Sequence, residues 1–498
     1  MAMWGGLPSG WPSPVSTHPM GRSRMVFSSY LFIFAFLPAF LILYKVIDSR
    51  FRNHLILAAS LFFYWIGDKA GTWVLLGAIL GNYLCGYLIG GLKERTPTVT
   101  SARARAMLIV GVVFNLSVLA YFKYVGFLTE NAKNFAALLG HPESVHIIKA
   151  ALPLGISFFV FQGISYLVDV YRGDVKATRS LLIFGTFKSL FPQLIAGPIV
   201  RYKDVAADLP GRTISHDMVF AGIHRFVIGF AKKVLLADTF AMTADEIFRL
   251  APGDLNVGTA WLGALSYTMQ IYFDFSAYSD MAIGLGLMMG FHFPENFNYP
   301  YNATSLRDFW RRWHMTLSGW FRDYVYVSLG GNRVGPARTY FNLFIVFVLT
   351  GLWHGASWTF VAWGLWHGFF MVAERYLKFE SLGIPLLLRR IYTLAVVIFG
   401  WVLFRAESFH QAFHMVAVML GLRSGAPGYP FAEFWDGMLV LAFVLAAVLS
   451  FPVYPRLGAA MPESWRLPSG FVLLSALFVL ASMKVLSGAY SPFLYFRF

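Results

Sequence analysis

Long apolar runs separated by short polar segments dominate the chain from residue 27 to residue 487. Only a helix satisfies its own backbone hydrogen bonds in lipid without help from a neighbouring segment. Since a span needs roughly 20 apolar residues, the pattern predicts an all-α polytopic membrane protein with about ten to twelve transmembrane helices. The runs lie near 27–47, 54–67, 72–91, 107–127, 150–170, 218–236, 259–291, 340–372, 391–404, 433–451 and 470–487.

One apolar segment, 181–202, is interrupted by Pro192, Gln193, Gly197 and Pro198. Proline removes a backbone donor and breaks a helix. Irregular backbone at membrane depth is tolerated only where protein covers it or where it lines a cavity. Two interpretations stay open: a re-entrant element, or a span that ends in an ordinary surface turn.

Segment 307–324, RDFWRRWHMTLSGWFRDY, mixes arginines with tryptophans. Its tryptophans, Trp310, Trp313 and Trp320, fall near one helical face. Basic residues beside a tryptophan face are typical of a helix lying at the membrane interface, and this alone accounts for the arginines. The functional alternative starts from His314, which lies among Arg311, Arg312 and Arg322. Guanidinium groups suit phosphates, so an anionic cofactor arriving from the cytoplasm is the ligand expected there.

The pentapeptide Gly-Leu-Trp-His-Gly occurs twice, at 351–355 and at 364–368, within the apolar segment 340–372. A titratable ring in hydrocarbon needs a partner or a water-filled cavity. On one continuous helix His354 and His367 would point about 140° apart, so at most one of them faces a given reaction centre. Glycines on both sides of His354 let another helix or a ligand approach closely. A purely structural role is the alternative for each histidine.

Two carboxylates, Asp274 and Asp280, interrupt the apolar run 259–291. They lie about 240° apart on a helix and therefore do not form a paired acid site. Carboxylates at membrane depth need partners. We expect each to pair with a different neighbour, such as an arginine of 307–322.

Composition fits a membrane protein: 57% of residues are hydrophobic, 13% are charged, and the net charge is +15. The basic residues lie in short loops between apolar runs, which favours a role in membrane orientation over nucleic-acid binding. Loops 48–53 and 92–106 are then cytoplasmic and the N-terminus is periplasmic. Cys85 is the one cysteine, so no intramolecular disulfide forms, and neither a cysteine cluster nor an HExxH motif suggests a metal.

Residues 1–24 are rich in Gly, Pro and Ser and lack the apolar centre of a signal peptide. We expect them to be a disordered extension, with Met25 as the natural beginning. The polar connections elsewhere are too short to fold alone, so 25–498 is predicted to be one membrane domain.

Several motifs together resemble the membrane-bound O-acyltransferase family, and within it the bacterial branch that acetylates exported polysaccharides such as alginate or cellulose. The resemblance runs from Met25 to Phe498. The motifs are MVFSSYLFIF (25–34), LPLGISFFVFQGISYLVDVYRG (152–173), FPQLIAGPIVRY (191–202), YFDFSAYSDMAIGLGLMMGF (272–291), NFNYPYNATSLRDFWRRWHMTLSGWFRDYVYVSLGGNR (296–333), LTGLWHGASWTFVAWGLWHG (349–368) and SPFLYFRF (491–498).

This resemblance implies a helical membrane core around a central funnel or tunnel, in a protein of the bacterial inner membrane. It implies transfer of acetyl from cytoplasmic acetyl-CoA, without a metal, towards an exported polysaccharide on the other face through an esterase-like periplasmic partner. By motif position the essential histidine is His354 and the second family histidine is His314. Arg311, Arg312 and Arg322 are the expected donor-binding residues, and His367 is expected to be structural. Neutral histidine can remove the proton of an attacking hydroxyl; whether His354 instead carries the acetyl group stays open.

Two alternatives remain at the level of sequence. A transporter without chemistry would use the intramembrane carboxylates and histidines as a proton path. Repeats would support that alternative, but the chain has no long internal repeat. Within the enzyme class, the acyl group could instead be D-alanyl or fatty acyl.

Overall fold

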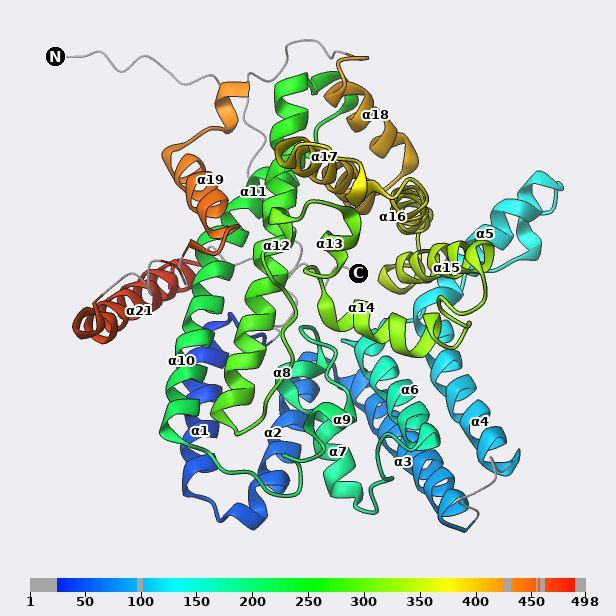
Figure 1. The fold of residues 1–498 in the computed structure, drawn as a ribbon, viewed down its shortest axis with the longest axis vertical. Coiled ribbons are helices and arrows are strands. Elements are labelled where there is room, and N and C mark those ends of the chain that lie inside the picture. Colours follow the sequence, from blue (N-terminus) through cyan, green and yellow to red (C-terminus); the bar gives the residue numbers. More distant parts are fainter. Residues whose placement is uncertain (1–24, 96–101, 424–430, 454–455, 457–461, 489–498) are drawn as a thin grey trace.

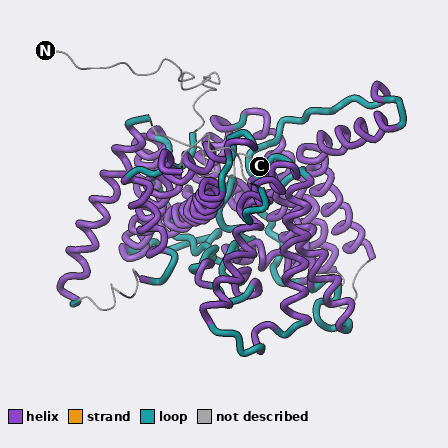
Figure 2. Tube along the Cα trace, turned by 90° about the horizontal axis from the view of Figure 1, so that it is seen from above, coloured by secondary structure: helices purple, strands orange, loops and turns teal. Residues whose placement is uncertain are grey.

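The structure, a computed structural model, describes residues 25–95, 102–423, 431–453, 456 and 462–488. Every regular element in these residues is a helix, and no strand occurs among them (Figure 1 and Figure 2). The predicted all-α class is therefore confirmed. The expectation for residues 1–24 lies outside the described residues.

Twenty α-helices follow one another along the described chain (Figure 1). The first six are α1 (Leu37–Val46), α2 (Arg52–Gly67), α3 (Lys69–Arg95), α4 (Ala102–Leu119), α5 (Val125–Leu138) and α6 (Ile156–Arg172). The middle part holds α7 (Leu181–Ser189), α8 (Phe191–Leu194), α9 (Tyr202–Val205), α10 (His216–Ala231), α11 (Asp238–Ile247) and α12 (Val257–Met288). The last part holds α13 (Leu306–Trp310), α14 (Met315–Phe321), α15 (Pro336–His354), α16 (Trp358–Tyr376), α17 (Leu386–Arg405), α18 (Phe409–Met419), α19 (Gly437–Leu449) and α21 (Glu463–Leu486).

Short π-helical turns interrupt or extend several of these helices. They are η1 (Phe32–Phe36), η3 (Ala120–Tyr124), η5 (Lys232–Ala237) and η8 (Arg322–Tyr326). In a π-turn the backbone bond runs to the fifth residue along, which inserts one extra residue and redirects the side chains around it.

Four helical stretches are long and apolar enough to cross a membrane: Lys69–Glu94, Ala102–Leu138, Leu386–Arg405 and Leu467–Leu486. Two shorter apolar helices are Phe32–Val46 and Gly437–Leu449. Apolar side chains on the long helices point outward, as Ile109, Val110 and Val113 do on α4. Outward apolar faces suit a lipid environment, so the protein is a polytopic membrane protein. The expected number of ten to twelve spans stays a prediction.

Helix α12 passes through the middle of the molecule beside α10 (Figure 1). A side chain cannot be added where the two helices meet. A Cβ on Gly222 would come within 2.7 Å of the carbonyl oxygen of Gly284, and one on Gly229 within 2.7 Å of that of Ala277. Glycine thus permits the close backbone approach that holds this central pair together.

The two carboxylates of α12 pair with cations of the neighbouring helix. Asp274 lies 2.6 Å from Lys233, whereas Asp280 lies 2.8 Å from Lys232 and 2.9 Å from Arg225. The prediction of separate partners is correct, but the expected arginine of 307–322 is wrong. The reason is that α10 and η5 run along α12 and present their own cations at the level of each carboxylate.

The stretch from α7 to α9 leaves and rejoins the same end of α6. Before it, Arg179 pairs with Glu94 at 2.7 Å, and Lys93 bonds a carbonyl at the C-terminal end of α6 at 2.7 Å. After it, Lys203 lies 3.4 Å from Asp169, also near that end of α6. Both ends of the stretch are therefore on one side, as in a re-entrant element.

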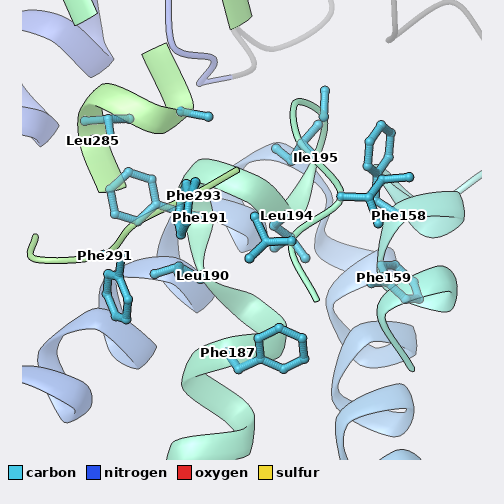
Figure 3. Packing of buried hydrophobic residues seen from close by; sticks show 14 of the residues in the cluster. Phe158, Phe159, Phe187, Leu190, Phe191, Leu194, Ile195, Leu285, Phe291 and Phe293 are labelled. Carbon is cyan, nitrogen blue, oxygen red and sulfur yellow. The ribbon is translucent and has the colours of Figure 1, made fainter. Parts of the chain in front are cut away.

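The tip of this stretch reaches the opposite end of α6, where Gly155 precedes the helix. A Cβ on Gly155 would collide with the carbonyl oxygen of Leu194. Phe187, Phe191 and Leu194 are fully buried and belong to the same hydrophobic cluster (Figure 3). Of the two open interpretations, the re-entrant one is the structure found. Protein covers the irregular backbone on all sides, which is the condition for placing it at membrane depth.

The apolar segment 340–372 is two helices, not one. Helix α15 ends at His354, Gly355 is extended with φ −164° and ψ 155°, and the Ser357 hydroxyl accepts the first-turn N–H of Thr359 to start α16. A serine N-cap gives a new helix a start signal. The angle of about 140° expected between the two histidines on one helix therefore does not apply.

Segment 307–324 also differs from its prediction of one interfacial helix. It forms α13 and α14, separated by a turn in which His314 has a φ of 42°. Trp310, Trp313 and Trp320 are at most 7% exposed and lie in the protein core. The left-handed backbone at His314 ends the helical periodicity, so the tryptophans do not form one outward face.

Candidate active site

His354 occupies the last residue of α15, next to the crossing with α16. The crossing depends on glycines of both pentapeptides: a Cβ on Gly364 would come within 2.5 Å of the carbonyl oxygen of Phe347. Glycine at Gly351 likewise lies against the backbone of Gly364. The expected close approach of another helix beside His354 is thus α16 itself.

Aromatic rings surround the imidazole of His354. Its ring centroid lies 4.9 Å from Trp353, 5.1 Å from Trp363 and 5.1 Å from Phe404. His354 is only 7% exposed. A polar ring in such a place is expensive unless it has a use or a partner.

His314 is held by an amide. Its Nδ1 lies 3.0 Å from Oδ1 of Asn296, and that oxygen also accepts the Thr316 hydroxyl at 2.8 Å. The Asn296 amide in turn donates to Ser279 at 3.0 Å. Because an amide oxygen only accepts, this network assigns the hydrogen to Nδ1. Nε2 then carries a lone pair, and it has no hydrogen-bond partner among the described residues.

Trp353 brings the two predicted histidines to one place. Its ring centroid lies 6.1 Å from that of His314 and 4.9 Å from that of His354. The structure thus gathers His314, from the turn before α14, and His354, from the end of α15, around one indole.

His367 lies apart from that indole, on α16. It is fully buried, and its ring packs against Trp363 at 4.9 Å and Trp310 at 5.2 Å. Neither ring nitrogen has a hydrogen-bond partner among the described residues. A ring held only by other rings fits the structural role expected for it.

A cavity of about 670 Å³ lies between α13, α14, α15 and α16. Its inner wall is apolar and includes Trp310, Leu317, Phe321, Phe347 and Thr350. Its lining also holds two carboxylates, Glu374 and Glu380, and a larger number of cations: Arg307, Arg311, Arg322, Arg375 and Lys378. Such a cavity suits a ligand with an anionic head and a long, less polar arm.

The predicted arginines behave differently from one another. Arg311 and Arg322 line this cavity. Arg312 is not among the lining residues; it pairs with Asp308 at 2.8 Å. Arg322 pairs with Asp323 at 2.7 Å. Burial alone would raise the pKa of Asp323, but hydrogen bonds from its arginine neighbours outweigh burial and hold that pKa below its ordinary value.

Two cations of the cavity were missed by the sequence analysis. Arg375, in the last turn of α16, and Lys378, just after that helix, lie more than fifty residues after Arg322. Among the described residues, neither they nor Arg311 has a carboxylate within ion-pair distance. The sequence shows basic residues after an apolar run. It does not show the chain reversal at Gly355, which brings these basic residues back to the cavity.

A second, much smaller cavity of about 40 Å³ lies on the other side of the last turn of α15. His354, Trp353, Lys123 and Ser157 line it, together with Leu152, Pro153, Gly155 and Ile156 before and at the start of α6. Thr350, one turn earlier on α15, lines the large cavity instead. One helical turn thus separates two cavities.

The two cavities lie towards opposite ends of α6. The small one borders its N-terminal end. The large one borders η8, to which Arg172 at the C-terminal end of α6 bonds through the Asp323 carbonyl at 3.0 Å. Buried histidines beside two cavities at opposite ends of α6 define the candidate active site.

Comparison with known proteins gives the class. A family model described as MBOAT, membrane-bound O-acyltransferase family, matches residues 174–410. A Pseudomonas putida protein named "Probable alginate O-acetylase" is 42% identical over 500 residues, which cover 95% of this chain and 100% of the relative. The peptidoglycan O-acetyltransferase of Helicobacter pylori is 37% identical over 434 residues, 80% of each chain. The teichoic acid D-alanyltransferase of Bacillus subtilis is 31% identical over 296 residues, 55% of this chain and 74% of the relative.

The chain belongs to the membrane-bound O-acyltransferase family, and it is an O-acyltransferase. The resemblance found in its motifs is confirmed. This assignment excludes the alternative of a transporter without catalysis.

Proposed function

We propose that this enzyme transfers acetyl groups from cytoplasmic acetyl-CoA for the O-acetylation of an exported polysaccharide, of the alginate type rather than the cellulose type. The main support is the relative named as an alginate O-acetylase, which matches over its whole length. The D-alanyltransferase relative covers only 55% of this chain, which makes D-alanyl transfer the weaker candidate. A fatty acyl group has no named relative in its favour among these proteins.

The donor occupies the large cavity in this proposal. The phosphates of acetyl-CoA meet Arg311, Arg322, Arg375 and Lys378, and the pantetheine arm lies along the apolar wall towards Thr350. Guanidinium groups bind phosphate oxygens with paired hydrogen bonds. The thioester then ends beside the turn that carries His354.

Acetyl transfer requires the acceptor hydroxyl to lose its proton as it attacks the thioester carbonyl. We assign proton removal to His354, which lines the small cavity. The new C–O bond forms, the C–S bond breaks, and the proton passes to the departing thiolate. His314 presents the lone pair of Nε2 to a hydrogen-bond donor at the reaction centre, while Asn296 fixes the opposite side of its ring. A histidine that carries the acetyl group would be the alternative route.

The size of the small cavity bears on the acceptor. About 40 Å³ has room for one hydroxyl group or water but not for a sugar ring. An acceptor hydroxyl on a narrow side chain fits this opening better than a polymer strand. We therefore propose an esterase-like periplasmic partner that takes the acetyl group and passes it to the polysaccharide.

Orientation in the bacterial inner membrane follows from charge. Lys93, near the end of α3, bonds the Tyr171 carbonyl at the end of α6, so this cation is at the same end of the molecule as the large cavity. Excess positive charge marks the cytoplasmic side. This supports a cytoplasmic entrance for the donor and a periplasmic N-terminus.

Membranes containing the enzyme, incubated with labelled acetyl-CoA and the cell's polymer-modifying fraction, test the proposal. We expect label in the polysaccharide with wild-type protein. His354→Ala should lower the rate by about 10²–10⁴-fold, the usual contribution of a general base, at unchanged protein level. Equal transfer by the variant would remove His354 from the mechanism. Incorporation of D-alanyl or fatty acyl in place of acetyl would overturn the donor assignment.

A further inference from the structure

A π-turn interrupts the long helical stretch Ala102–Leu138 at η3, and Lys123 and Tyr124 are its last two residues. A lysine at this depth in an apolar helix is costly unless its ammonium is used. Single π-turns inside α-helices occur frequently at functional sites, because the extra residue redirects side chains. Here they are redirected towards the end of α15.

The two side chains bind three consecutive carbonyls. The Tyr124 hydroxyl donates to the carbonyl of Leu352. The Lys123 ammonium donates to the carbonyl of Trp353 at 2.5 Å and to that of His354 at 3.0 Å. These carbonyls belong to the last turn of α15, where a helix has no backbone N–H left to offer them. A cation is also the favoured partner for the negative end of a helix.

The third donor of the Lys123 ammonium is also used. Ser157, near the start of α6, has its hydroxyl oxygen 3.2 Å away. A charged lysine has three N–H bonds and no acceptor. All three contacts tie the Lys123 side chain to the turn, so this arrangement suits a role in holding the backbone in place.

We propose that Lys123 and Tyr124 are positioning residues for His354, and that the π-turn exists to deliver them as a pair. Together they fix the backbone of the turn that carries the imidazole and separates the two cavities. This inference rests on the proposed role of His354. Lys123 contributes through the placement of that ring, since a misplacement of about 1 Å in a catalytic group can cost on the order of 10²-fold in rate.

Steady-state kinetics with full-length enzyme in lipid nanodiscs and labelled acetyl-CoA tests the pair. Lys123→Met keeps the length of the side chain but loses the charge and all three donors. We expect kcat to fall by about 10-fold or more, with the KM for acetyl-CoA unchanged, because the donor binds in the other cavity. Lys123→Arg retains charge and donors and should keep more activity. Tyr124→Phe loses one hydrogen bond and should show a smaller fall in kcat.

Lys149→Met is the matched control, and this variant should behave as wild type. Lys149 is exposed and lies three residues before Leu152, which lines the small cavity. Thermal stability shows whether Lys123→Met folds. If it does not, the kcat of Tyr124→Phe, which keeps the lysine, tests the positioning role. Wild-type kcat in the folded variants, or a raised KM with unchanged kcat, would overturn the inference. His354→Ala in the same assay separates the two proposals: an active His354→Ala enzyme defeats the proposed mechanism, whereas an inactive one beside an active Lys123→Met defeats only the positioning role.

Discussion

The three buried histidines differ in what holds their rings. Asn296 orients His314 through Nδ1. His354 lies at the end of a helix whose terminal carbonyls are bound by Lys123 and Tyr124. His367 has only ring contacts and also blocks the space beside Gly400, where a Cβ would come within 2.7 Å of its Nε2. A histidine with an oriented ring nitrogen can take part in chemistry, whereas a position that requires only packing accepts any ring of similar size.

At this scale we predict that His314→Ala abolishes most activity and His367→Phe does not. His314→Ala removes the oriented lone pair and should lower kcat by about 10²-fold or more. His367→Phe replaces one ring by another against Trp310 and Trp363. Acetyl content of the polysaccharide, measured at equal protein level, checks both variants. An inactive His367→Phe beside an active His314→Ala would reverse the two roles.

Individual residues were predictable where a motif marked them. His314 and His354 were singled out by motif position, and Arg311, Arg312 and Arg322 by their clustering beside His314. The structure brings the two histidines together around Trp353, while the roles of these residues stay predictions. Asn296 was not found, because an asparagine in a polar loop carries no such signal. Lys123 stood alone inside an apolar run, and this signal could have singled it out.

At the scale of elements, the reversal between α15 and α16 builds the large cavity. It sets Arg375, in the last turn of α16, and Lys378, just after it, in the same cavity lining as Arg311. The turn is short and its cues are local: an extended Gly355 and the Ser357 N-cap. The hydrophobic pattern continues through it, so apolar periodicity alone suggests one helix. The break at His314 lacks even such local cues, since no proline or glycine lies beside it.

We predict that Arg311→Gln raises the KM for acetyl-CoA while leaving kcat near wild type. Arg311 faces the large cavity without an ion-pair partner among the described residues, so its loss removes uniform binding. A change of about 3- to 10-fold is expected for a single exposed charge.

Arg312→Gln is its matched control. Arg312 is bonded to Asp308 at 2.8 Å and does not line the cavity, so KM should stay unchanged and thermal stability should fall slightly. Kinetics and melting curves on the same preparations separate binding from scaffold. A raised KM in the Arg312 variant alone would move the phosphate site from Arg311 to Arg312.

The α15–α16 crossing gives a stability prediction. Gly364→Ala places a methyl group within 2.5 Å of the Phe347 carbonyl. Overpacking of this kind costs about 1–3 kcal/mol, so the melting temperature should fall. Gly77→Ala on α3 meets no atom within 4 Å and should melt as wild type or slightly higher. Equal melting of both variants would mean that the crossing can relax without cost.

At the scale of the whole molecule, the distribution of positive charge and the location of the two cavities support the same proposed orientation in the membrane. The apolar pattern predicted the class because lipid restricts a spanning backbone to few solutions. It did not show which helices meet. The pairing of α12 with α10, and the partners of Asp274 and Asp280, depend on tertiary packing between segments tens of residues apart. The predicted single domain, 25–498, stays a prediction.

Orientation can be tested by labelling. In a Cys85→Ser background, Lys378→Cys lies in the large cavity and Leu152→Cys in the lining of the small one. A membrane-impermeant thiol reagent added to intact spheroplasts should modify Leu152→Cys only, and inverted vesicles should give the opposite result. Acetyl-CoA should slow modification of Lys378→Cys. Labelling of Lys378→Cys in spheroplasts would invert the topology proposed from positive charge.

The burial of Trp353 bears on whether ions can leak through the protein across the membrane. Its indole is 3% exposed and packs against Phe158 at 5.5 Å and Phe161 at 5.4 Å, so a wall of rings stands between the two cavities. A continuous water column through the protein would conduct protons down the membrane potential, a drop worth about 2.3 kcal/mol per charge at 100 mV. In the proposed function, the enzyme delivers an uncharged two-carbon unit across the same barrier. In that case the buried indole provides electrical insulation, which keeps the bilayer sealed against ion leakage while the acetyl group is transferred beside it.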